Sequence, residues 1–85
     1  MKIIVNQEAM NNWLQKAKPG EKAIYYDGML LAEREKFFAA GGTPERLPEP
    51  MRVARIAWKA YLDGIVHLVQ KRKGMMSYAY IAVRA

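Results

Sequence analysis

The amino-acid sequence predicts an α+β fold, with three helices beside a small antiparallel sheet that ends in a C-terminal β-hairpin. Three observations lead to this fold class. Apolar residues recur at helical spacing over residues 51–63. Residues 65–72 and 77–84 are runs of alternating side chains, rich in β-branched and aromatic residues, as half-buried strands are. A short basic link that contains Gly74 joins the two runs, which is the pattern of a hairpin.

The helix at residues 51–63 is amphipathic. It is expected to begin just after Pro50 and to end at Gly64, because proline favours the first turn and glycine adopts the left-handed conformation that ends helices. One broad side is apolar and packs on the core: Val53, Ala54, Ala57, Trp58, Ala60 and Tyr61. Three cations lie on the opposite, exposed side at spacings of three and four: Arg52, Arg55 and Lys59.

The hairpin after this helix is predicted to have one face toward the helices and a cationic tip. Residues 71–74 form the tip, and Gly74 is free to adopt a positive φ angle there. The face predicted to pack on the helices consists of Val66, Leu68, Ile81 and Val83. Tyr78 and Tyr80 then face away from the core.

The first fifty residues contain the remaining elements. They are an extended lead-in at 2–5, a helix capped by Asn6 that runs to about Lys18, a strand over 23–26, a tight turn at 27–28, a helix from about Leu30 to Ala39, and a proline-rich loop at 43–50 that excludes regular structure. Six aromatic residues at helical or strand spacing are expected in the core: Trp13, Tyr25, Phe37, Phe38, Trp58 and Tyr61.

The composition excludes several classes of function. With 85 residues we expect one domain over 1–85, and with no cysteine there is no disulfide or thiolate metal site. The single histidine, His67, has no cluster of ligands around it in the sequence, so we expect no metal, no cofactor and no catalytic residue. No apolar run is long enough for a membrane span, which favours a cytoplasmic protein without membrane contact.

The charge is unevenly distributed along the chain. Residues 1–50 contain seven Lys or Arg and seven Asp or Glu, whereas residues 51–85 contain seven Lys or Arg against the single Asp63. The whole net charge of +6 therefore belongs to residues 51–85. Such an imbalance indicates that this part meets a polyanion.

This order of elements resembles the winged helix-turn-helix family of DNA-binding domains. The resemblance depends on a third helix that ends in AYLDG, the strand IVHLVQKR directly after it, and the return strand YAYIAVR. It implies three helices beside a small sheet, with the third helix in the major groove and the final hairpin as the wing. The loop at 43–50 is longer than the three or four residues of a compact helix-turn-helix. The chain also resembles short proteins of phages and prophages.

If the resemblance holds, the protein binds double-stranded DNA as a transcriptional regulator or mobile-element factor, as a homodimer. Arg52 and Arg55 would read bases from the start of the third helix, and Lys59 would meet the backbone. The wing cations Lys71, Arg72 and Lys73 would contact phosphates.

Other interpretations remain open. The line of cations on helix 51–63 is also typical of an ordinary solvated helix face. RNA is a further candidate for the same cations. The second hypothesis is a protein-interaction module, such as a phage-type inhibitor of a host nuclease or polymerase. Its interface would use two methionines at the hairpin tip and the outward tyrosine pair, namely Met75, Met76, Tyr78 and Tyr80.

Overall fold

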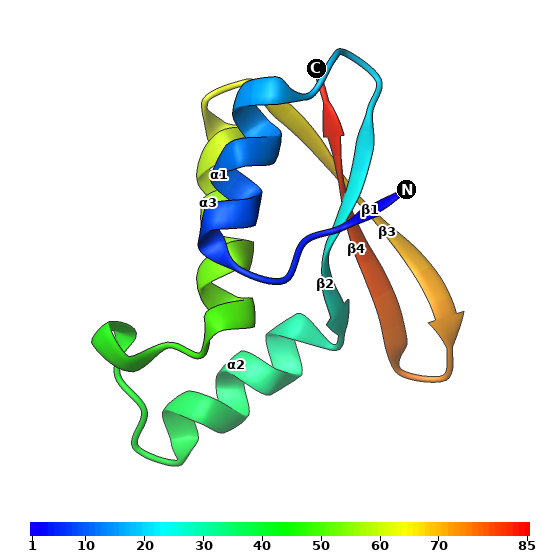
Figure 1. Cartoon of the computed structure of the whole chain (residues 1–85). Helices are drawn as coiled ribbons and strands as arrows, with labels where there is room; N and C mark the ends of the chain where they lie inside the picture. The colour runs from blue at the N-terminus through cyan, green and yellow to red at the C-terminus, as the bar shows by residue number, and fades with distance from the viewer.

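The computed structural model describes residues 1–85 and confirms the α+β class, with three helices and one four-stranded sheet (Figure 1). The elements in chain order are β1 Lys2–Ile3, α1 Gln7–Lys16, β2 Lys22–Gly28, α2 Leu30–Ala39, the 3₁₀ turn η1 Pro44–Arg46, α3 Glu49–Leu62, β3 Val66–Gly74 and β4 Ser77–Arg84.

The sheet is mixed, and its strand order is β1-β2-β4-β3. β2, β4 and β3 pair antiparallel, as predicted for the sheet and its C-terminal hairpin. β1 adds a short parallel strand against β2, where Lys2 is opposite Ala23. The prediction of a purely antiparallel sheet therefore needs correction, because residues Lys2–Ile3 of the lead-in add a parallel edge strand.

Two helices, α1 and α3, cover one face of the sheet (Figure 1). Small residues on the inner side of α3, among them Ala57 and Ala60, let the helix approach the strands closely. The start of α3 is also tied to the start of α1, because Oε2 of Glu49 accepts a hydrogen bond from the Gln7 amide at 2.8 Å. The largest fully buried side chains of the core are Met10, Val53 and Val66.

The other face of the sheet has no helix over it (Figure 1). One aliphatic row crosses all four strands on this bare face, since the register places Ile3 beside Ile24, Ile24 beside Ile81, and Ile81 beside Val69. Ile81 in the central strand is buried at 6% exposure, whereas Ile3 at the edge is 66% exposed. The central strand β4 is therefore apolar on both of its faces.

Helix α2 is placed differently from the other two helices. It has no buried residue and extends away from the sheet below α3 (Figure 1). Its first residue is anchored, because the Leu30 amide donates to the Tyr80 hydroxyl at 3.1 Å. Oε2 of Glu33 accepts from the Met29 amide at 2.9 Å, and Gly28, at φ +129°, leaves the space that this carboxylate occupies.

Several predicted boundaries need correction. β2 continues through the predicted tight turn at 27–28, and α1 ends two residues early. α3 begins at Glu49 rather than after Pro50, because a proline is tolerated in the first helical turn, so its first turn and η1 occupy the loop predicted to be irregular. The predicted stop at Gly64 is confirmed by its φ of 77°.

The hairpin also differs from the prediction. β3 extends through residues 71–74, so the turn consists of Met75 and Met76 alone. The left-handed residue is Met76, at φ 57°, and Gly74 has no positive φ. The two cations of the predicted tip that precede Lys73 are paired strand residues, because Lys71 is opposite Ala79 and Arg72 is opposite Tyr78.

The predicted facing of the hairpin is wrong for its return strand. Tyr80 belongs to the core beneath the helices at 8% exposure, and Tyr78 packs against that core. Ile81 and Val83 lie on the bare face instead. The physical reason is that β4 is apolar on both faces, so alternation does not show which face is inward. On the inner face, the Tyr80 ring packs edge-on against the rings of Tyr25 and Tyr26.

Candidate nucleic-acid interface

The exposed side of α3 presents two of the three predicted cations. Arg55 and Lys59 are exposed, as the helical spacing predicted. Nζ of Lys59 lies 3.6 Å from Oδ2 of Asp63, an exposed pair that contributes little energy and is easily exchanged for another anion. Arg55 has no carboxylate partner. It is therefore the cation of α3 with a free guanidinium.

Arg52 does not join this pair as a free cation. It is half-buried, its Nε donates to the Leu47 carbonyl at 2.7 Å, and its Nη2 donates to the Glu45 carbonyl at 3.2 Å. The guanidinium therefore holds the linker before α3 against the helix. Helical spacing placed Arg52 on the outer side, but it could not show that the preceding linker returns to satisfy that side chain.

The three predicted wing cations are exposed, and they do not form one patch. Arg72 is on the helix-covered side of the sheet, in register with Tyr78, and its Nε donates to the Gly74 carbonyl at 3.2 Å. Lys71 is on the bare side and has no carboxylate partner. Nζ of Lys73 lies 2.6 Å from Oδ2 of Asp27, with both side chains half-exposed. Lys71 and Arg72 are thus the wing cations without an acidic neighbour.

The residues of the predicted protein interface divide into two pairs. Met75 and Met76 are exposed at 87% and 69%, at the tip of the hairpin. Tyr80 is a core residue and Tyr78 is partly buried against the core, so the pair does not face away from it. The Tyr80 hydroxyl is already engaged with the Leu30 amide. Only the methionine tip keeps the exposure that the sequence predicted.

Two aromatic residues expected in the core are instead exposed on α3. Trp58 is 56% exposed and Tyr61 is 44% exposed, with their ring centroids 5.3 Å apart. Trp13 and Tyr25 are buried as predicted, while Phe38 on α2 remains 38% exposed. The apolar sector of α3 is wider than the strip that the sheet and α1 cover. That excess width was the only signal in the sequence for exposed aromatics.

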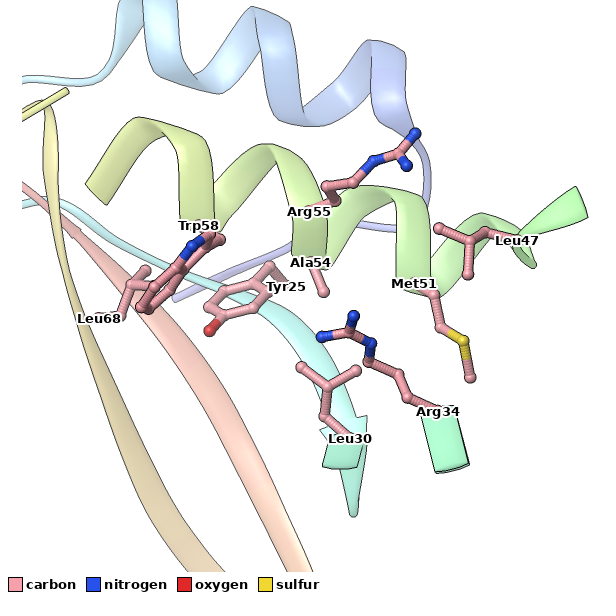
Figure 2. Close-up of a pocket in the computed structure, with 9 residues that line it drawn as sticks. All are labelled: Tyr25, Leu30, Arg34, Leu47, Met51, Ala54, Arg55, Trp58 and Leu68. Atoms are coloured by element: carbon pink, nitrogen blue, oxygen red, sulfur yellow. The ribbon is translucent and has the colours of Figure 1, made fainter. Parts of the chain in front are cut away.

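A cavity of about 330 Å³ lies beside the exposed Trp58, between α2, α3 and the sheet (Figure 2). Seven of its nine lining residues are apolar or aromatic. The side chains that line it are Tyr25, Leu30, Arg34, Leu47, Met51, Ala54, Arg55, Trp58 and Leu68. Sequence reasoning missed this cavity, because it depends on α2 standing away from α3.

The two charged residues at the cavity are both arginines, and they point in different directions. Figure 2 shows the guanidinium of Arg34 directed between Tyr25, Leu30 and Ala54, whereas that of Arg55 points away from the cavity. Burial and the neighbouring Tyr80 raise the pKa of Tyr25 to about 12, so its hydroxyl keeps its proton at neutral pH. The cavity therefore combines one inward cation with a neutral hydroxyl.

No three His, Asp or Glu side chains come close enough together to hold a metal ion. His67 is exposed on β3. None of the helices has the length and apolar character needed to cross a membrane.

Comparisons with family models, with curated proteins and with solved structures gave no significant match.

Proposed function

We propose that this protein binds double-stranded DNA through the outer side of α3 and the basic hairpin, as a transcriptional regulator or mobile-element factor with a winged-helix-like fold. The observation that carries the proposal is the set of exposed cations without acidic partners within residues 51–85, namely Arg55 on α3 and Lys71 and Arg72 on β3. Phosphates are the polyanion that such cations neutralise, with release of counterions.

The order of elements supports the same proposal. A helix, a strand, two helices and a hairpin follow one another as α1, β2, α2, α3, β3 and β4, and the return strand β4 lies between β2 and β3. This is the order that a winged helix requires. The α2–α3 pair departs from it, because residues 40–48 separate the two helices and α2 barely approaches α3. We therefore assign contact with DNA to α3 and the hairpin without α2.

The contacts of Arg52 change the expected division of roles. Since its guanidinium is bound to carbonyls of the linker, Arg55 remains as the base-reading candidate on α3. Lys59 can leave its exposed partner Asp63 for a phosphate at little cost. Lys71 and Arg72 would add phosphate contacts that raise affinity without sequence information. The alternative of a protein-interaction module loses one support, because Tyr78 and Tyr80 face the core.

The test is fluorescence anisotropy with a labelled random-sequence DNA duplex, titrated at several salt concentrations. Non-specific binding is expected with a Kd of roughly 10⁻⁴ to 10⁻⁶ M at physiological salt, tightening as salt is lowered. The double variant Arg55→Glu with Arg72→Glu, two unpaired cations on the helix-covered side of the sheet, should bind much more weakly and with a shallower salt dependence. Each lost phosphate contact reduces the slope of log K against log salt by about one.

The matched control is the double variant Lys16→Glu with Lys18→Glu, at the far end of α1, which changes the net charge by the same amount. Circular dichroism verifies that both variants fold. Equal weakening in the two variants would reduce the effect to net charge and overturn the assigned interface. No binding by the folded wild-type protein at low salt would overturn the function itself. A duplex RNA of the same length, run in parallel, distinguishes the two nucleic acids.

A further inference from the structure

We propose that the cavity between α2, α3 and the sheet binds a small molecule that joins an apolar body to a carboxylate. The proposal concerns ligand binding and is independent of DNA binding. The volume of about 330 Å³ is within the range of small-molecule sites, roughly 300–1,000 Å³. Such sites are mostly apolar with a few polar groups that fix orientation, which is the composition of this lining.

The space is present because α2 does not fill it. Of the ten residues of α2, only Leu30 and Arg34 line the cavity, and none is buried. The opposite walls are firm, since Met51 and Ala54 on α3 and Tyr25 on β2 belong to the core. The hydrogen bond from the Leu30 amide to the Tyr80 hydroxyl fixes the start of α2, which is the end of that helix that lines the cavity.

The charge at the cavity indicates the head group of the ligand. Arg34 points inward and has no carboxylate partner, because the two ion pairs of the chain are Lys59–Asp63 and Lys73–Asp27. Its neighbour Glu33 is turned back onto the Met29 amide. An arginine beside an apolar cavity matches a carboxylate in geometry, since its planar fork donates two parallel hydrogen bonds.

The shape of the space suits an elongated body. A second hollow, lined by Val69, Gln70 and Tyr80, shares four lining residues with the first and continues it along β3. The shared residues are Tyr25, Leu30, Trp58 and Leu68. An aliphatic chain that enters beside Arg34 can therefore continue over Leu68 and against the indole of Trp58.

The experiment titrates the full chain with decanoate and, separately, with decanol, both below the concentration at which they aggregate. Isothermal titration calorimetry gives the affinity, and tryptophan fluorescence reports the site, because Trp58 lines the cavity whereas Trp13 is buried under the helices. Saturable binding of decanoate is expected, and decanol should bind more weakly.

The decisive variant is Arg34→Gln, which removes the cation from an exposed position and should leave the fold intact. Decanoate should then bind about tenfold or more weakly, the loss typical of a charge-assisted hydrogen bond, while the affinity for decanol stays the same. Lys36→Gln is the matched control, since it removes one cation from the same helix outside the cavity. Trp58→Phe should abolish the fluorescence change while calorimetric binding persists.

Three results would overturn the proposal: no saturable binding of decanoate, an unchanged affinity in Arg34→Gln, or an equal loss in Lys36→Gln. No DNA is present in these titrations. A negative result would therefore overturn the ligand site without bearing on the DNA-binding proposal.

Discussion

The layer formed by α1 and α3 differs from α2 in almost every contact, although α1 and α2 have the same length of ten residues. α1 and α3 bury large and small residues against one face of the sheet, among them Met10, Trp13 and Val53. α2 buries none, and only Leu30 and Phe37 pack partly against the core. The difference teaches that helix formation and helix packing are separate properties. Both proposed sites occur where packing is incomplete.

Truncation of one large aromatic residue in each region should give the largest difference in stability. Trp13→Ala, on α1, should reduce the free energy of unfolding by about 3–5 kcal/mol, because the side chain is 4% exposed and leaves a cavity. Phe38→Ala, on α2, should cost about 0.5 kcal/mol, as surface substitutions do. Urea denaturation monitored by circular dichroism measures both. Equal losses would mean that α2 is packed as firmly as α1.

At high pH the two regions can be distinguished by the pKa values of Tyr25 and Tyr26. The pKa of Tyr25 is raised to about 12, mainly by burial and to a smaller extent by the neighbouring Tyr80. The pKa of Tyr26 is also raised to about 12, mainly by burial and to a smaller extent by Glu33 on α2. Both hydroxyls keep protons longer in the folded state, so this stability is complete below pH 10 and is lost as the pH rises toward 12.

Glu33→Gln should lower the pKa of Tyr26 and leave that of Tyr25 unchanged, because only Tyr26 faces the carboxylate from α2. Phenolate absorbance, with Tyr25→Phe and Tyr26→Phe for assignment, measures the two values. A fall in both pKa values would show that α2 acts on the core as a unit and that the two regions are not independent.

The N-caps of α1 and α2 should differ in their contribution to stability, by less than the aromatic residues do. The Asn6 side chain accepts from the Ala9 amide at 2.8 Å, whereas the N-cap of α2, Met29, makes no side-chain bond. Asn6→Ala should cost about 1 kcal/mol in global unfolding. Met29→Ser should add less than that globally, because α2 can open without the core. Amide hydrogen exchange in α2 should nevertheless become slower. An unchanged exchange rate would show that the missing N-cap does not determine how often α2 opens.

The smallest expected effect concerns the link between α1 and α3. Hydrogen bonds from the backbone and side chain of Gln7 hold the pKa of Glu49 below its usual value of 4.5. The resulting stability is present above that value and is lost as the pH falls through the lower, folded-state pKa. Glu49→Gln should therefore flatten the acid limb of the stability curve, measured by thermal melts at a series of pH values. An acid limb identical to that of the wild-type protein would mean that this carboxylate contributes nothing there.

Much of the fold could be predicted from the sequence, since helical periodicity located α3 and the glycine at 64 located its end. The class, the three helices and the hairpin follow from local patterns of this kind. Three features could not be predicted, because each depends on distant contacts. The carbonyls that bind Arg52 come from the linker, and Trp58 is exposed because α2 stands away. The inner face of β4 depends on the packing of Tyr80 against Tyr25 and Tyr26 of β2.

The aliphatic row on the bare face of the sheet has a consequence for folding fidelity. When one face of a strand is polar, a slip of one residue would bury polar groups, so patterning alone fixes the alignment of partners. β4 lacks that protection, since a slip would exchange Tyr80 for Ile81, one apolar side chain for another. Correct alignment must then be enforced by irregular features. These are the interruption of pairing near Tyr25, the two-residue turn with left-handed Met76, and the bond between Tyr80 and Leu30.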